Sequence, residues 1–290
     1  MNRALLWLSR RSLRTLHAIG AALGWAAYGM SPSYRRRLRA NAALAGVGAD
    51  DRRASVAEAG RMVAELPRLW LRPPDQPIGD PVHWQGAELI DQLLSQGRGL
   101  VLLTPHMGSF EVAGQAYAER FGARQPLTAL YRPARHRWVR ELEETARARP
   151  ALATAPANLA GVRQMMRALR RGETIGLLPD QVPPDGMGVW APFFGQGAYT
   201  MTLAARLVQQ TGAAVCLIWA ARLPRGSGYS VQVRPLPEPL PAREGLSEEA
   251  WTLAAATAIN RSMEAVIAHE PTQYLWGYHR YKQPRQQPGT

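Results

Sequence analysis

The stretch from Leu100 to Val112 constrains the fold of this chain more than any other part of the sequence. It opens with a short apolar run that ends at Leu103, which is the pattern of a buried strand, and Thr-Pro-His follows directly. Gly108 then marks a tight turn, and Ser109 is suited to cap a following helix. His106 is therefore expected where a strand passes into a helix at the open edge of a sheet, and α/β folds place their chemistry at such edges.

Glu111 lies five positions after His106, in the first turn of the expected helix. On a continuous helix the two side chains would diverge by about 140 degrees, but the intervening turn lets the carboxylate fold back to the imidazole. A neutral imidazole can take a proton from a hydroxyl, and a carboxylate can fix its tautomer. Gly-x-Ser-x-Gly is absent and Ser109 has other flanks, so the base would activate a substrate hydroxyl. The alternative is a histidine satisfied at a strand end beside a glutamate that suits a helix start.

Further motifs follow in a fixed order, and together they resemble one family. His106-x4-Glu111 is similar to the first signature of the lysophospholipid acyltransferase superfamily, and the wider context resembles the bacterial lipid A late acyltransferases. The similarity spans nearly the whole chain, although Ser109 and Phe110 stand where that family often has asparagine and tryptophan. The later blocks are Leu130-Tyr131-Arg132-Pro133, Gly176-Leu177-Leu178-Pro179-Asp180-Gln181, residues 188–195 with Thr200, and residues 274–280.

The resemblance implies an O-acyltransferase that moves a fatty acyl chain from an acyl thioester, on acyl carrier protein, to a hydroxyl of a lipid A precursor. In this interpretation His106 is the general base and Glu111 orients it. Main-chain N–H groups near Gly108 would stabilise the oxyanion, with Arg132 beside them. The implied location is the cytoplasmic face of the inner membrane, on its anionic surface.

Two other polar residues also end predicted strands. Arg132 ends the strand over 127–131, and Asp180 with Gln181 follows the strand over 174–178. If these strands are neighbours of the one before His106, all three ends share one edge of the sheet. We expect Arg132 to interact with Asp180. The residues expected to bind substrate are Arg132, Asp180, Gly108 and Gln181. The alternatives are an arginine in solvent and a turn aspartate.

Composition sets the outer bounds. At 290 residues and 46% hydrophobic content the chain can bury a full core. The formal charge of +13, with Lys282 as the only lysine, favours anionic partners such as membrane lipids, phosphorylated glycolipids or acidic carrier proteins. The single cysteine, Cys216, excludes an internal disulfide and is expected to be a buried inert thiol. The six histidines show no metal-ligand spacing, so we expect no metal and no other cofactor.

Residues 1–46 predict a helical segment that associates with a membrane. Residues 15–34 contain no Asp, Glu, Lys or Arg, and arginines flank them on both sides. A spanning helix needs about 20 mostly apolar residues, and Gly20, Gly24 and Pro32 make this segment marginal. An amphipathic helix lying in the interface fits better. A cleaved signal peptide and a helix packed on the core remain as alternatives.

The rest of the chain predicts an α/β domain over residues 47–283, with a mixed, mostly parallel central sheet flanked by helices. Residues 284–290 are polar and are expected to be a disordered tail. Two helices are expected between residues 35 and 72. Strands are expected at 99–104, 127–131, 174–178, 213–221 and 229–234, and helices at 87–95, 109–121, 135–147, 159–171, 201–211 and 247–269.

Three other functions stay open. Within enzymes, the acceptor could be a lysophospholipid or another glycolipid. Outside enzymes, a strongly basic chain could bind nucleic acid, but its basic residues are dispersed and no nucleic-acid-binding signature is present, so we expect no nucleic-acid partner. A non-catalytic lipid-binding relative is disfavoured because His106 and Glu111 are both intact. The apolar block at 189–194 either walls an acyl-chain channel or fills the core. Trp276, His279 and Arg280 suit an interface or a phosphosugar as well as a helix end.

Overall fold

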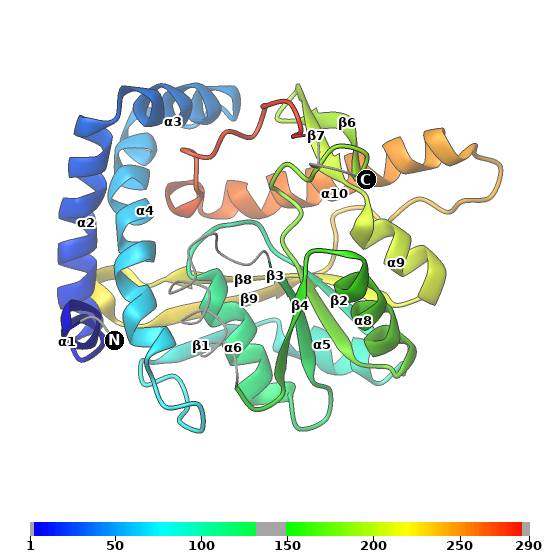
Figure 1. Ribbon diagram of the computed structural model, residues 1–290, viewed down its shortest axis with the longest axis horizontal. Coiled ribbons are helices and arrows are strands. Elements are labelled where there is room, and N and C mark those ends of the chain that lie inside the picture. Colours follow the sequence, from blue (N-terminus) through cyan, green and yellow to red (C-terminus); the bar gives the residue numbers. More distant parts are fainter. Residues whose placement is uncertain (1–2, 132–148, 286–290) are drawn as a thin grey trace.

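The computed structural model describes residues 3–131 and 149–285, and it has a central sheet with helices on both faces (Figure 1). Seven strands form the sheet in the order β1-β9-β8-β2-β5-β3-β4. The strands β8, β2, β5, β3 and β4 are mutually parallel, whereas β9 is antiparallel to β8 and parallel to β1. The prediction of a mixed, mostly parallel sheet flanked by helices is therefore confirmed.

The strands of this sheet are short. They are β1 (Val82–Gln85), β2 (Leu100–Leu103), β3 (Leu127–Tyr131), β4 (Leu152–Pro156), β5 (Thr174–Leu177), β8 (Ala214–Arg222) and β9 (Tyr229–Arg234). A separate antiparallel hairpin consists of β6 (Gly188–Phe193) and β7 (Gln196–Met201). Five of the sheet strands match the predicted ranges within one residue at each end, while β1 and β4 were not expected. Both of these strands lie at the edges of the sheet, where half-exposed residues leave no continuous apolar run.

The helices divide between an N-terminal group and the two faces of the sheet. They are α1 (Arg3–Ser9), α2 (Leu13–Met30), α3 (Pro32–Leu44), α4 (Ala49–Trp70), α5 (Ala87–Leu94), α6 (Phe110–Phe121), α8 (Leu159–Arg170), α9 (Leu203–Thr211) and α10 (Glu248–His269), with 3-10 turns η1 (Pro224–Gly226) and η2 (Pro271–Gln273). The helix expected at 135–147 lies outside the described residues, as does most of the expected tail.

The central strand β2 explains why an apolar run precedes His106. Val101 and Leu103 face the core shared with α8, α9 and α10, and Leu100 and Leu102 face the core shared with α5 and α6. A strand buried on both faces needs apolar residues at every position. Cys216, on the neighbouring strand β8, is fully buried as predicted.

The N-terminal helices α2 and α4 lie side by side at the left of Figure 1. Their backbones come close because Gly20 and Gly24 of α2 face Gly60 of α4, where any side chain would clash with the opposite helix. These glycines, which weakened the case for a spanning segment, therefore serve helix packing. No helix in the described part of the chain is both long enough and apolar enough to cross a membrane.

The C-terminal segment after α10 is buried, in contrast to one of the interpretations of its sequence. The side chains of Trp276 and Arg280 are each only 2% exposed. Arg280 donates to the Tyr199 carbonyl and the Thr200 hydroxyl, both at 2.7 Å, so it holds the hairpin in place. An interface or phosphosugar role is therefore wrong for Trp276 and Arg280, whereas for His279, which is exposed, it stays a prediction. Phe193 of the hairpin is likewise part of the core.

Candidate active site

Two of the predicted residues meet at the carboxyl edge of the sheet. His106 follows β2 and Asp180 follows β5, and these strands are parallel neighbours. The Nδ1 atom of His106 lies 2.7 Å from Oδ1 of Asp180, and the His106 main-chain N–H donates to Oδ2 at 2.9 Å. One carboxylate therefore fixes both the backbone and the ring of the histidine. The arrangement leaves Nε2 as the ring nitrogen that can exchange a proton with a ligand.

The environment of Asp180 favours its charged form. Burial, with the side chain only 2% exposed, acts to raise the pKa of Asp180. The charge of His106, two hydrogen bonds from this residue and the more distant charge of Arg280 outweigh burial and lower the pKa. The buried Tyr274 has its pKa raised by burial and by the nearby negative charge of Asp180. Asp180 is therefore a carboxylate that can stabilise an imidazolium.

The turn between β2 and α6 is fixed by its own backbone contacts. The N–H of Gly108 donates to the Gln273 carbonyl at 3.0 Å, and the N–H of Ser109 donates to the Ala220 carbonyl at 2.8 Å. Both donors are thus occupied, and the prediction that main-chain N–H groups near Gly108 bind the oxyanion is wrong for these two residues. Gly108 has a φ of +56°, and a Cβ there would clash with the Ala220 carbonyl. Only glycine adopts this positive φ without strain and also leaves room for the Ala220 carbonyl.

Glu111 does not orient the Nδ1 atom of His106, contrary to the prediction, because Asp180 occupies that position. Glu111 lies in the first turn of α6 and acts electrostatically on Arg149, whose buried guanidinium donates to the Leu69 carbonyl at the end of α4. Burial, followed by the charge of Arg72, lowers the pKa of Arg149 to about 10. The physical reason for the difference is topological: Asp180 arrives on the strand next to β2, whereas Glu111 leaves the turn with the helix.

The remaining predicted residues have separate outcomes. Arg132 lies outside the described residues, so its predicted interaction with Asp180 stays a prediction. Gln181 follows Asp180 and is partly exposed at the same edge of the sheet. Among the described residues no group of three or more His, Cys, Asp or Glu side chains is placed to hold a metal ion.

Sequence reasoning missed two residues that support the turn. Arg222, the last residue of β8, donates to the Gly108 carbonyl at 2.7 Å. The side-chain amide of Gln273 donates to the Arg222 carbonyl at 3.1 Å and accepts from its N–H at 2.9 Å. Arg222 ends a predicted strand in the same way as Asp180, so its position was a usable signal. Gln273 follows the last helix and carries no such signal.

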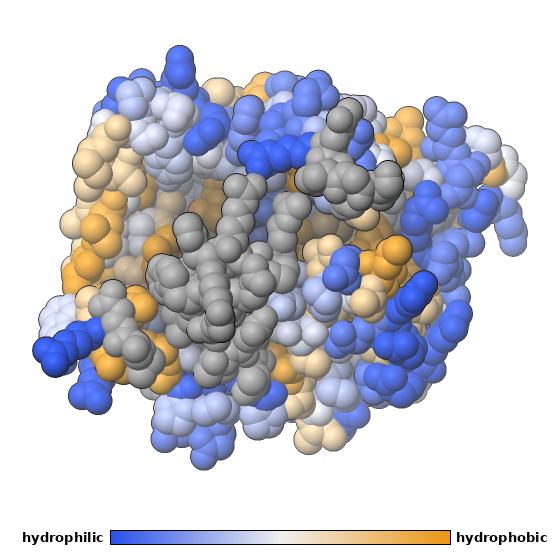
Figure 2. Space-filling model, viewed as in Figure 1, coloured by the Kyte–Doolittle hydropathy of each residue, from blue (hydrophilic) through white to orange (hydrophobic). Residues whose placement is uncertain are grey.

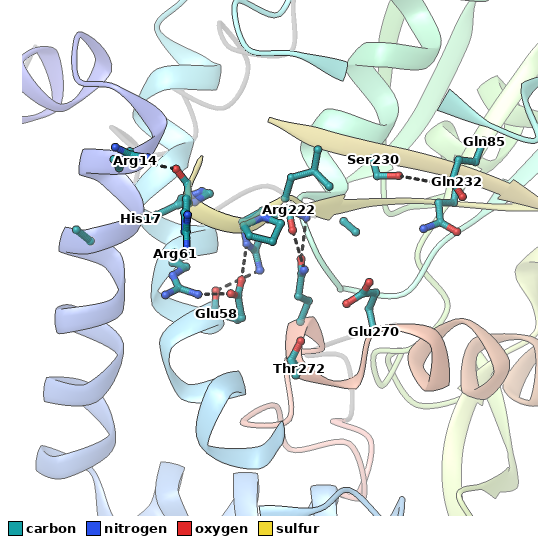
Figure 3. A pocket seen from close by; sticks show the side chains of 16 residues that line it. Arg14, His17, Glu58, Arg61, Gln85, Arg222, Ser230, Gln232, Glu270 and Thr272 are labelled. Atoms are coloured by element: carbon teal, nitrogen blue, oxygen red, sulfur yellow. Dashed lines mark hydrogen bonds and ion pairs between the residues drawn. The ribbon is translucent and has the colours of Figure 1, made fainter. Parts of the chain in front are cut away.

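A cavity of about 740 Å³ opens behind this turn, between α2, α4, the ends of β8 and β9, and η2 (Figure 3). Its wall includes Arg222 and Gln273 but neither His106 nor Asp180. The His106 ring therefore lies outside this cavity, and Arg222 connects the two regions.

An imidazole held by a buried carboxylate at the carboxyl edge of an α/β sheet has the chemistry that acid–base catalysis requires. The chain belongs to the bacterial lipid A biosynthesis acyltransferase family, whose model matches residues 4–283. It is therefore an O-acyltransferase of lipid A biosynthesis.

Three relatives from Escherichia coli (strain K12) show how similar the chain is to characterised members. It is 27% identical to the lipid A biosynthesis palmitoleoyltransferase over 239 residues, which cover 81% of this chain and 73% of that protein. It is 26% identical to the lauroyltransferase over 224 residues, with 77% and 68% covered. The myristoyltransferase is 24% identical over 227 residues, with 78% and 66% covered. These relatives are named for different acyl chains, so the similarity assigns the reaction class but no chain length.

Proposed function

We propose that this protein transfers a fatty acyl chain from acyl carrier protein to a hydroxyl on an acyl chain of a lipid A precursor. The observation that carries the proposal is the His106–Asp180 pair at the edge of the sheet, in a chain of this family. In the proposed reaction Nε2 of His106 removes the proton of the acceptor hydroxyl as its oxygen attacks the thioester carbon. The carbon–sulfur bond then breaks, and the departing thiolate takes the proton held by the imidazolium and leaves as a thiol.

Asp180 serves this step in two ways. Its contact with Nδ1 keeps a proton on that nitrogen, so Nε2 has a free lone pair before the reaction. Its negative charge then stabilises the imidazolium formed when the hydroxyl is deprotonated. Glu111, in the first turn of the helix that follows His106, acts electrostatically on the buried Arg149.

The oxyanion needs a donor other than Gly108 and Ser109. Phe110 is the first residue of α6, and its N–H has no acceptor among the described residues. The ring of Phe110 lies with its centroid 5.3 Å from that of His106, so this residue lies beside the imidazole. We assign the N–H of Phe110, with the positive end of the α6 dipole, to the developing oxyanion.

The outer face of the N-terminal helices suits a membrane surface. Figure 2 shows hydrophobic residues along the margin that α2 forms, and the exposed side chains of Trp7, Leu23, Trp25 and Met30 are 46–79% accessible. Arginines accompany the exposed aromatic rings: the guanidinium of Arg11 lies 4.8 Å from the centre of the Trp7 ring. Apolar residues with arginines beside them favour the interface of an anionic bilayer. We propose that α1 and α2 lie on the cytoplasmic surface of the inner membrane, where a lipid acceptor would be reached.

The central experiment incubates the purified protein with acyl carrier thioesters of graded chain length and an under-acylated lipid A precursor. Mass spectrometry identifies which product gains which chain, and a lysophospholipid acceptor is tested in parallel. His106→Ala should abolish transfer, whereas His83→Ala should not, because His83 is exposed on the edge strand β1. Wild-type transfer by His106→Ala would refute the proposal. Transfer to the lysophospholipid alone would assign the other acceptor.

Membrane docking is tested separately by co-flotation with vesicles that contain anionic phospholipid. Replacing Leu23, Trp25 and Met30 by serine should abolish flotation. A matched control replaces Leu159 and Leu253, which are 71% and 44% exposed on α8 and α10. Equal flotation of both variants would show that α2 is not the docking face.

A further inference from the structure

Arg222 joins the turn after His106 to the N-terminal helices. Its side chain is 2% exposed, and its guanidinium donates in three directions. Nη1 donates to the Gly108 carbonyl at 2.7 Å and lies 3.3 Å from the Glu65 carboxylate. Nε donates to the Glu58 carboxylate at 2.8 Å, and Nη2 donates to the Glu58 carbonyl at 3.3 Å. Glu58 and Glu65 both belong to α4.

The same cluster reaches α2 and β9. The carboxylate of Glu65, which is fully buried, lies 3.1 Å from Nε2 of His17 on α2 and accepts from the Tyr229 hydroxyl at 3.3 Å. Glu58 is also paired with Arg61 on its own helix. Figure 3 shows Glu58, Arg61 and His17 converging on Arg222 from the two helices. Burying several charges is costly unless each is paired, so this cluster requires a specific position for α4 relative to β8.

The contact with Gly108 gives the cluster a role beyond packing. Gly108 is two residues from His106, and its carbonyl is the group that Arg222 binds. The main-chain carbonyl of Gln273 accepts from the N–H of Gly108. The side-chain amide of Gln273 bonds to the main-chain N–H and carbonyl of Arg222. On the opposite side Asp180 holds the N–H and ring of His106. The turn is thus fixed at both ends, by Asp180 at one end and by Arg222 with Gln273 at the other.

We infer that Arg222 is a positioning residue for acyl transfer, which places the His106 turn by fastening the Gly108 carbonyl to Glu58 and Glu65 of α4. The inference rests on the proposed function for its kinetic consequence. Arginine is required because its planar fork reaches the carbonyl and both carboxylates at once, whereas a lysine ammonium is a single point. The helices that we propose to lie on the membrane are in this way tied to the catalytic turn.

The test uses the full-length protein and the variant Arg222→Lys, which keeps the buried positive charge and loses the fork. A displacement of a catalytic group by about 1 Å can cost about 10²-fold in rate, so we expect kcat to fall by about 10²-fold. The KM values for the acyl thioester and the acceptor should stay close to those of the wild type, because Arg222 touches neither in this scheme.

The matched control is Arg68→Lys. Arg68 lies on α4, as Glu58 and Glu65 do, and makes a two-point ion pair with Asp80, at 2.7 and 3.1 Å. It also donates to the Arg11 carbonyl at 3.0 Å. It therefore joins the same group of helices to the body without touching the turn. The control variant should lose stability, measured by thermal unfolding, while keeping kcat.

A second readout does not depend on activity. The proton between His106 Nδ1 and Asp180 should give a downfield NMR signal in protein labelled with ¹⁵N-histidine, and His106→Gln identifies it by its loss. Arg222→Lys should shift or broaden this signal, and Arg68→Lys should leave it in place.

Gln273→Leu serves if Arg222→Lys fails to fold, because it removes two hydrogen bonds to Arg222 and leaves no unpaired charge. It should change kcat and the NMR signal in the same direction. A folded Arg222→Lys or Gln273→Leu variant with wild-type kcat and an unshifted signal would overturn the inference. Equal effects of Arg68→Lys would overturn it as well. If the wild type transfers no acyl group, the proposed function fails, and the NMR comparison still decides the position of the turn.

Discussion

The substitution Asp180→Asn tests whether one carboxylate sets the chemistry of His106. Asparagine has nearly the same shape and can still accept the His106 main-chain N–H through its amide oxygen, a contact that is 2.9 Å long in the wild type. The amide nitrogen then faces Nδ1, which must accept a hydrogen bond instead of donating one. The ring proton moves to Nε2, and that nitrogen can no longer act as a base.

The magnitude follows from the lost charge. Opposite unit charges about 4 Å apart attract by about 4 kcal/mol at an effective dielectric constant of about 20, and each 1.36 kcal/mol corresponds to about tenfold in rate. The imidazolium in the transition state loses this attraction, so we expect kcat to fall by about 10³-fold. The ground-state protein should lose about 1.5–3 kcal/mol of stability, because a hydrogen bond to a charged group is removed.

The assay measures acyl transfer by mass spectrometry under saturating thioester, beside thermal unfolding of the same preparations. Asp185→Asn is the matched control, because Asp185 is exposed in the loop that follows Asp180. A folded Asp180→Asn protein with wild-type kcat would refute the assignment of Asp180, and a comparable loss in Asp185→Asn would show that the effect is not specific.

Three further predictions concern the backbone and the buried groups. Gly108→Ala should cost about 1–3 kcal/mol of stability from strain at positive φ, and more from the clash with Ala220, whereas Gly46→Ala, at φ +69° in open space, should show the strain alone in urea unfolding. Burial, and then the charge of Glu58, raise the pKa of Glu270 in the folded protein. The protonated Glu270 therefore stabilises the fold fully below the pKa that this residue has in the unfolded chain. This stabilisation is lost as the pH rises through the pKa of Glu270 in the folded protein. Glu270→Gln should therefore raise the melting temperature relative to the wild type more at pH 7 than at pH 4, and an equal difference at both would contradict this. Burial raises the pKa of Cys216 to about 12, so a thiol reagent should modify the single cysteine only in denaturant, and rapid labelling of the native protein would contradict the structure.

Much of the fold was predictable because its central strands are buried on both faces. The strands β2 and β8 consist almost entirely of apolar residues. The helix α10 begins just after Ser247, whose side chain accepts from the N–H of Ala250 as a capping residue should. The edge strand β1 contains no apolar run, and its alternation of partly buried and exposed residues extends over only four positions, so its local signal is weak. Strands that lie at a sheet edge are defined by pairing to distant residues, and the local pattern does not contain that pairing.

The candidate site was predictable to the extent that polar residues end apolar strands. This rule identified His106 and Asp180 and placed them at one edge, as the structure has them. It did not determine the pairing within that edge, because the sequence puts Glu111 five positions from His106 and Asp180 far away along the chain. The order of the strands makes Asp180 the nearer residue, and strand order is a long-range property.

Arg222 is a third polar residue that the same rule, that polar residues end apolar strands, would have identified. It ends the predicted strand over 213–221 and lies on the other side of β2 from β5, so His106 has a strand-end charge on each side. The two charged residues act differently because they contact different groups. Asp180 contacts the histidine directly. Arg222 forms ion pairs with Glu58 and Glu65 and contacts the turn through the Gly108 carbonyl. The turn after β2, held between a carboxylate and a paired arginine, is fixed along the edge of the sheet in both directions. Its geometry should therefore depend on α4 as well as on the sheet, and the comparison of Arg222→Lys with Arg68→Lys measures that dependence.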